Sequence, residues 1–170
     1  MKKLLLVTAF LVSNLLVSYG QSTPIEPGQK APEILLSSPA GTMIALSSCR
    51  GKLVLIDFWA TWCAPCVQEQ DELARLYQMF RNSAFTNGKG FEIYGVSLDA
   101  KRQDWEGTIA KKHIGWTQVS DLKFWRSPVA KTYNIQELPF NVLIDGNGTI
   151  LARNLHGEEL ERCITKYLRK

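Results

Sequence analysis

The chain has 170 residues, enough for one domain with a sizeable core. Hydrophobic residues make up 45% and charged residues 21% of it, which is ordinary for a globular protein. The net charge of +4 includes Lys2 and Lys3, so the chain after residue 20 has 18 of the 20 basic residues against 16 acidic ones. No basic block stands out, and the composition gives no indication of a nucleic-acid partner.

Residues 1–20 are typical of an export signal. Two lysines precede a mostly apolar stretch over residues 4–17, and Ser18 and Gly20 supply the small residues that precede a cleavage site. We therefore expect export to the bacterial periplasm, with cleavage near Gly20–Gln21. The alternative is an N-terminal membrane anchor, although the apolar stretch is shorter than the roughly 20 residues that span a bilayer.

The next segments predict a lead-in and a hairpin. Residues 21–32 contain three prolines and a glycine among polar residues, which indicates an extended lead-in without a core of its own. Residues 33–170 would then form one domain. Its first elements are two short strands, residues 33–36 and 42–46, on either side of the turn sequence Ser-Pro-Ala-Gly.

Alternating strands and helices follow this hairpin. The continuous apolar run over residues 53–56 predicts a central strand buried on both faces. Apolar residues at helical spacing then continue to Asn82, and residues 91–98 predict a second buried strand after a loop at 87–90. The remaining predictions are helices over 101–113, 125–133 and 157–168, with a hairpin of strands 140–144 and 149–153 before the last helix. This order favours a mixed sheet with helices on both faces.

Two cysteines lie at the start of the first helix, in the sequence Phe-Trp-Ala-Thr-Trp-Cys-Ala-Pro-Cys over residues 58–66. A helix N-terminus stabilises a thiolate through its free N–H groups and its dipole, and this lowers the thiol pKa. Cysteines one helical turn apart can also close and reopen a disulfide. The segment therefore predicts thiol–disulfide exchange, with Cys63 at the exposed mouth of the helix as the attacking thiol and Cys66 as the resolving thiol.

This segment resembles the active site of the thioredoxin superfamily, most closely its exported TlpA/ResA-like branch. Trp62 before the first cysteine, Pro65 before the second and Asp57 six residues upstream of Cys63 match the family pattern. The resemblance covers most of the chain after residue 28. It implies an α/β thioredoxin-like fold: a central mixed sheet with helices on both faces, an N-terminal hairpin extension and a helical insertion before the hairpin that carries a cis-proline.

The same resemblance gives two acidic residues candidate roles beside the cysteines. Asp57 is expected to face the core, where burial raises the pKa of a carboxyl, and to move protons between the two sulfurs. Glu69, one turn after Cys66, matches a glutamate that tunes the acidity of the thiol pair. A solvated surface role for Glu69 stays open.

Substrate contact is expected from both sides of the cysteine pair. The resemblance places Trp62, Ala64 and Pro65 on the surface that meets the partner. It also implies that Pro139 is cis and faces the cysteines, so that the backbone at Leu138 is free to pair with an incoming peptide strand. Phe140 stands where the family often has threonine.

The other cysteines and histidines form no recognisable metal motif. Zinc would need two ligands besides the cysteine pair, and Cys49, Cys163, His113 and His156 lack a second CxxC or HxxxH spacing. We therefore expect no metal and no cofactor other than the redox-active disulfide Cys63–Cys66. Whether Cys49 and Cys163 pair stays open, and two separately buried thiols are favoured.

Together these features predict an exported thiol–disulfide oxidoreductase that acts, as a monomer, on cysteine-containing proteins. Proline at position 65 favours a reductase, which would need a membrane thiol-electron donor. ResA-like proteins imply a role in cytochrome c maturation. The alternatives are a peroxiredoxin-like peroxidase, for which Ile56 and Ala60 replace the required proline and threonine, and a non-catalytic CxxC module that binds a metal or a partner.

Overall fold

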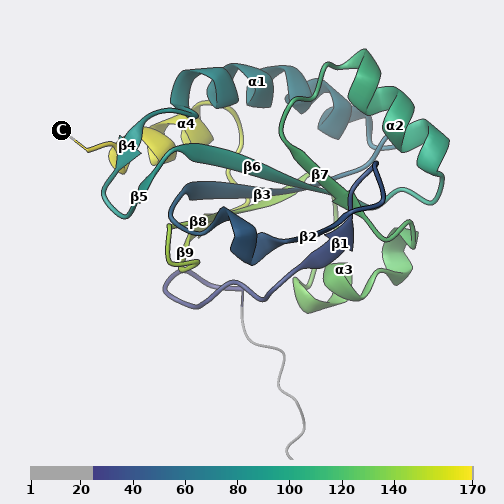
Figure 1. Ribbon diagram of the computed structural model, residues 1–170, viewed down its shortest axis with the longest axis horizontal. Helices are drawn as coiled ribbons and strands as arrows, with labels where there is room; N and C mark the ends of the chain where they lie inside the picture. The colour runs from purple at the N-terminus through teal and green to yellow at the C-terminus, as the bar shows by residue number, and fades with distance from the viewer. Residues whose placement is uncertain (1–24, 170) are drawn as a thin grey trace, which may run out of the picture.

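The structure, a computed structural model, describes residues 25–169 (Figure 1). The predicted export signal over residues 1–20 and the start of the lead-in lie outside the described residues. Between residues 25 and 169, no helix is long and apolar enough to cross a membrane.

A seven-stranded mixed sheet forms the centre of the fold. Its strands are β1 (Leu35–Ser37), β2 (Met43–Ala45), β3 (Leu53–Trp59), β6 (Phe91–Ser97), β7 (Thr117–Ser120), β8 (Phe140–Ile144) and β9 (Ile150–Arg153). They are arranged in the order β2-β1-β7-β6-β3-β8-β9. β3, β6 and β7 are parallel to one another, whereas the hairpins β1–β2 and β8–β9 join the sheet antiparallel.

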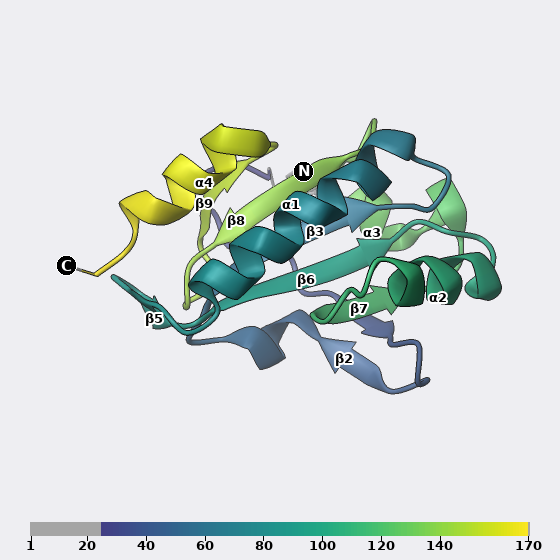
Figure 2. The same cartoon turned by 90° about the horizontal axis from the view of Figure 1, so that it is seen from above.

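Helices cover both faces of the sheet, as the sequence predicted. The helices are α1 (Ala64–Phe80), α2 (Arg102–Lys111), α3 (Pro128–Thr132) and α4 (Gly157–Lys166). α1, α2 and α4 lie on one face, and α3 lies on the other (Figures 1 and 2). This is the thioredoxin-like α/β arrangement that we expected.

β3 is buried on both faces, which explains its continuous apolar sequence. Val54, Ile56 and Phe58 point into the core on the α3 side, and Leu55 and Trp59 into the core under α1. Because side chains alternate along a strand, Asp57 shares the face of Leu55 and Trp59. The carboxyl end of β3 therefore presents an acid to the helix that carries the cysteines.

The sequence did not predict β7, and the element order inferred from it lacked this strand. Val119 is the only apolar residue among its four residues, yet Gln118 and Ser120 are buried. Both have polar partners: Gln118 Oε1 accepts from Trp59 Nε1 at 2.9 Å, and Ser120 Oγ donates to the carbonyl of Ser97 at 2.9 Å. The insertion is thus helix, strand and helix, and β7 connects the N-terminal hairpin to the sheet.

Two local boundaries also differ from prediction. The segment 125–133 is not one helix but a 3-10 turn (Phe124–Arg126) followed by α3, because Ser127 before Pro128 is extended. A residue before proline is disfavoured in the helical region, and Pro128 takes the first helical position, where its missing N–H costs no hydrogen bond. The predicted loop at 87–90 contributes to a small hairpin of β4 (Ala84–Phe85) and β5 (Gly88–Lys89).

The described part of the lead-in is extended and packs against the domain. Gly28 N donates to Ile150 O and Ile150 N donates to Gln29 O, both at 2.8 Å, so this segment runs along β9. Ile25 and Ala31 are buried in the core on the α3 side. The lead-in therefore shares the core of the domain rather than standing apart from it.

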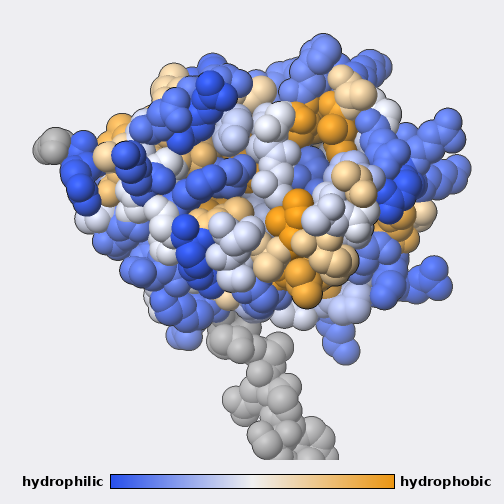
Figure 3. All heavy atoms as spheres, in the orientation of Figure 1, coloured by the Kyte–Doolittle hydropathy of each residue, from blue (hydrophilic) through white to orange (hydrophobic). Residues whose placement is uncertain are grey.

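The N-terminal hairpin ends the opposite side of the sheet. A 3-10 turn (Leu46–Cys49) follows β2 directly. Leu35 and Met43, one on each strand, are more than half exposed. An apolar patch lies over this hairpin among mainly polar surroundings (Figure 3).

Candidate active site

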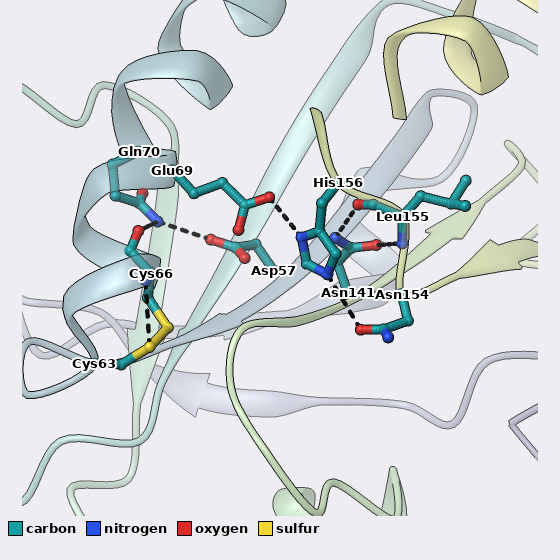
Figure 4. Close-up of polar contacts among 9 residues, drawn as sticks. All are labelled: Asp57, Cys63, Cys66, Glu69, Gln70, Asn141, Asn154, Leu155 and His156. Carbon is teal, nitrogen blue, oxygen red and sulfur yellow. Dashed lines mark hydrogen bonds and ion pairs between the residues drawn. A yellow bond between two sulfur atoms is a disulfide. The ribbon is translucent and has the colours of Figure 1, made fainter. Parts of the chain in front are cut away.

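Cys63 and Cys66 form a disulfide at the N-terminus of α1, as predicted (Figure 4). Cys63 is the N-cap residue, and its Sγ accepts a hydrogen bond from the backbone N of Cys66 at 3.3 Å. Pro65 occupies the first turn, where its missing N–H costs no helical hydrogen bond. This N–H contact and the helix dipole would stabilise a thiolate on Cys63 once the disulfide is reduced.

The prediction that Cys63 sits at an exposed helix mouth is wrong for the disulfide form. Cys63 is 6% exposed and Cys66 is fully buried. Both belong to the apolar core under α1, and Leu138 packs against that core. Cys63 is still the outer of the two cysteines, which agrees with the order of attack that we expected.

Asp57 is buried on the face of β3 that packs against α1, the helix that carries the cysteines. Its exposed fraction is 1%, and desolvation raises the pKa of its carboxyl to about 7, as we predicted in direction. Gln70 Nε2 donates to Asp57 Oδ2 at 3.1 Å and to the carbonyl of Cys66 at 3.3 Å. This amide joins the acid to the backbone of the inner cysteine and opposes the rise in the pKa of Asp57.

Gln70 was missed in the sequence. It lies four residues after Cys66 on the buried face of α1, and Leu73 and Leu76 continue that face. Its spacing from Cys66 is the signal that could have identified it, since residues four apart on a helix are neighbours. A polar residue on an apolar stripe indicates a buried partner.

Glu69 forms a partly buried ion pair rather than a contact with a sulfur. Its Oε1 lies 2.7 Å from Nδ1 of His156, and the Glu69 side chain is 12% exposed. The hydrogen bond to Glu69 raises the pKa of His156. The charge of Glu69 also raises the pKa of Asp57, whereas His156 lowers it (Figure 4). The predicted tuning of the thiols by Glu69 stays a prediction.

Asn141 fixes the loop that presents His156. It lies beside Asp57 in the register of β3 and β8. Its Nδ2 donates to the carbonyl of Leu155 at 2.6 Å, and Leu155 N donates to Asn141 Oδ1 at 3.1 Å (Figure 4). His156, which caps α4, is thereby held against α1. Neither Asn141 nor this role of His156 was predicted.

A set of hydrogen bonds around Asp99 holds the segment just before the cysteines. The buried Asp99 accepts hydrogen bonds from Thr61 N at 3.1 Å and Thr61 Oγ1 at 2.6 Å. Ser97 Oγ donates to the other carboxylate oxygen of Asp99 at 2.7 Å. The carboxyl end of β6 therefore positions the turn that leads into Cys63, and Asp99 was also missed in the sequence.

The residues predicted to contact substrate surround the disulfide. The Leu138–Pro139 peptide bond is cis, as expected. Trp62, Ala64 and Pro65 are exposed, and Leu138 and Pro139 are half-buried. A groove of about 380 Å³ runs between the start of α1 and the loop before α4; it is lined by Pro65, Gln68, Glu69, Glu72, Pro139, His156 and Gly157.

The other two cysteines are not paired. Cys49 is buried and Cys163 is half-buried, and both are free thiols. Burial raises the pKa of each thiol. Within residues 25–169, no group of three or more His, Cys, Asp or Glu side chains could hold a metal ion.

A disulfide at a helix N-cap, a buried acid linked to the inner cysteine and a cis-proline in the adjoining groove define a thioredoxin-like redox site. A family model described as Thioredoxin-like matches residues 51–150. The chain belongs to this family.

The relatives of the chain identify the kind of thioredoxin-like protein. The chain is 32% identical over 160 residues to thiol-disulfide oxidoreductase ResA of Bacillus cereus, covering 89% of this chain and 82% of that relative. Among solved structures, the thioredoxin domain of a thiol-disulfide oxidoreductase from Bacteroides vulgatus superposes with a TM-score of 0.76 at 33% identity, covering 85% of this chain and 99% of that one. A thiol-disulfide oxidoreductase from Bacteroides fragilis gives 0.72 at 35% identity, covering 81% and 98%. The protein is thus a thioredoxin-like thiol–disulfide oxidoreductase.

Proposed function

We propose that the protein reduces disulfides in other exported proteins through the Cys63–Cys66 pair, without a further cofactor. The observation that carries this proposal is the buried Asp57, which the amide of Gln70 connects to the backbone carbonyl of Cys66. Proline at position 65 supports the reducing direction, because strong oxidases of this superfamily tend to carry histidine there.

The reaction begins from the reduced dithiol. The thiolate of Cys63 attacks one sulfur of the substrate disulfide, forms a mixed disulfide and releases the other substrate sulfur as a thiolate, which takes up a proton. Asp57 accepts the proton of Cys66, whose thiolate then attacks Cys63 Sγ and breaks its bond to the substrate. The second substrate sulfur leaves as a thiolate and takes up a proton from the solvent, while Asp57 releases its own. Counted from the dithiol, whose Cys63 proton has passed to the solvent, the enzyme loses two electrons and two protons, and the substrate gains two of each.

Recognition of the substrate would use the groove beside Pro139. The Leu138 carbonyl and N–H lie outside β8, and the Leu138 side chain packs against the core that contains both cysteines, which supports pairing with an extended substrate segment. Glu69 and Glu72 line the same groove and would make one side of it acidic.

The proposed location, oligomeric state and substrate rest on the sequence. The pattern of residues 1–20 supports export to the periplasm, where a reductase depends on a thiol donor in the membrane. We infer a monomer. Among protein substrates, the resemblance to ResA-like proteins supports the CxxCH cysteines of apocytochromes c.

The reduction potential of the Cys63–Cys66 pair tests the direction. It is measured by equilibrating the protein with a thiol redox buffer and following Trp62 fluorescence. A potential near or below about −230 mV supports a reductase, whereas a value close to about −120 mV identifies a disulfide-forming oxidase and contradicts the proposal.

A trapping experiment tests the chemistry. Cys66→Ser removes the resolving thiol and should accumulate mixed disulfides through Cys63. Cys163→Ser, at a half-buried cysteine outside the site, is the matched control and should accumulate none. Failure of Cys66→Ser to trap a substrate disulfide would reject the mechanism.

A further inference from the structure

Three aromatic side chains form an exposed cluster at the rim of the disulfide. This aromatic cluster consists of Trp62, Phe124 and Trp125, which are 46%, 40% and 37% exposed. Ring centroids lie 5.1 Å apart for Trp62 and Phe124, 5.9 Å for Trp62 and Trp125, and 6.1 Å for Phe124 and Trp125. Each ring therefore contacts the other two while keeping a large part of its surface in water.

The cluster joins segments that are far apart in the sequence. Trp62 directly precedes Cys63, and its Nε1 donates to the carbonyl of Leu98 at 3.3 Å. The other two rings come from the 3-10 turn Phe124–Arg126, in the insertion between β7 and α3. The insertion thus places two large apolar side chains next to the residue that adjoins the attacking cysteine.

The backbone of the insertion has an unusual conformation at the turn that carries these two rings. Leu122 and Phe124 both have φ of 56°, in the left-handed region that bulky residues rarely adopt. Asp121 stabilises the turn, because its two carboxylate oxygens accept from Lys123 N at 3.1 Å and from Ser127 Oγ at 2.8 Å. Unfavourable backbone conformations of this kind concentrate at binding and active sites.

The cluster differs in chemistry from the groove beside Pro139. That groove is lined by Glu69, Glu72 and His156 among other residues, and none of the three aromatic residues lines it. A peptide that crosses the disulfide would therefore meet polar groups at the groove and apolar rings on the side of Trp62. Aromatic side chains of this kind are typical anchors of protein interfaces.

We propose that the aromatic cluster binds a large apolar side chain of the substrate protein, located two residues from the substrate cysteine in an extended segment. The cysteine of such a segment must face Cys63. In an extended chain, residues two positions apart face the same way and lie about 7 Å apart. The side chain at that offset then reaches the rings adjacent to Cys63. This inference rests on the proposed action on protein disulfides.

Peptides test the preference directly. Each peptide is short and holds one cysteine in a mixed disulfide. The residue two positions before or after this cysteine is varied among leucine, tryptophan and serine. The readout is kcat/KM for each peptide divided by kcat/KM for a small disulfide, hydroxyethyl disulfide. The wild-type protein should prefer leucine and tryptophan over serine by about tenfold at one of the two offsets, as expected for one interface anchor.

Two variants connect the preference to the cluster. Phe124→Ser with Trp125→Ser should reduce the preference to about twofold or less. Met79→Ser replaces a comparably exposed apolar residue of α1 outside the cluster and should keep the wild-type preference. Thermal unfolding of both variants checks that they fold.

The outcomes separate this inference from the proposed function. Equal wild-type rates on all peptides, or a preference that survives loss of both rings, would overturn the role of the cluster while leaving disulfide reduction intact. Failure of the wild-type protein to reduce any peptide disulfide would reject the proposed function itself.

Discussion

Asp57→Asn should stabilise the protein at neutral and alkaline pH while slowing catalysis. The pKa of Asp57 is about 7 in the folded protein, against an ordinary value of 3.8. Between these values the folded protein holds a proton that the unfolded chain has released, so the free energy of unfolding falls as pH rises. Each pH unit in that window removes about 1.4 kcal/mol, or about 4 kcal/mol over the whole window. The neutral asparagine does not titrate and avoids this loss.

The assay is urea unfolding of the disulfide form at pH 4, 5.5, 7 and 8.5. The difference in free energy of unfolding between Asp57→Asn and wild type should grow from pH 4 to pH 7 by several kcal/mol and then level off. Groups that titrate alike in both proteins cancel in this difference. Asp71→Asn, at an exposed carboxylate on α1 that pairs with Lys112, is the control and should show no comparable growth.

Activity supplies the second readout. Because Asp57 accepts the proton of Cys66 in the proposed mechanism, Asp57→Asn should lower the rate of the resolving step by about 10²-fold or more. A stability difference that stays constant across the pH range would refute the conclusion that burial raises the pKa of Asp57. A stabilised variant with a normal rate would instead refute its role in proton transfer.

Three further predictions follow from contacts around the site and the sheet. The ion pair with Glu69 raises the pKa of His156, so any stability that the pair provides is complete below about pH 6.5 and is lost as pH rises through the folded pKa. Glu69→Gln should return the pKa of His156 towards its ordinary value in an NMR titration. An unchanged pKa would contradict the pairing. Gly95→Ala should lower the free energy of urea unfolding by about 1–3 kcal/mol, because a Cβ at this position collides with the buried Gln118 side chain. Gly107→Ala, which has open space around it on an exposed part of α2, should raise the free energy of unfolding by up to about 1 kcal/mol. Asn141→Ala should lose about 1–3 kcal/mol, because it leaves the N–H and carbonyl of Leu155 without their side-chain partners; an unaffected midpoint would show that the loop is fixed by other contacts.

The sequence was sufficient where local pattern and burial agree. The apolar run over residues 53–56 identified the central strand, since every residue of β3 is buried. Cysteines three apart, with proline in the first helical turn, located both the disulfide and the start of α1. The residues that determine these features lie close together in the sequence. For this part of the site, the resemblance to a known fold was needed only to place Asp57 on the inner face of β3.

The sequence was insufficient where polar groups are buried by distant partners. β7 has one apolar residue, and Oε1 of its buried Gln118 accepts a hydrogen bond from Trp59, which lies 59 positions away. Gln70 and Asn141 are also polar. Gln70 acts through its contact with Asp57, and Asn141 acts through its contact with Leu155. No local periodicity carries such information, because the hydrogen bonds form only after the strands have paired. The helix boundary at Ser127 has a local cause instead: Pro128 disfavours the helical region for the residue before it, so the helix begins at the proline.

The two edges of the sheet are protected against the addition of strands from other molecules. On one side the lead-in occupies backbone groups of β9 through its hydrogen bonds to Ile150. On the other side β2 has only three residues and passes directly into a 3-10 turn, so it offers few free N–H and carbonyl groups to an approaching strand. Short and covered edges are devices by which β proteins avoid edge-to-edge aggregation. The exposed apolar side chains of Leu35 and Met43 therefore lie on a hairpin whose backbone gives a growing aggregate little to extend.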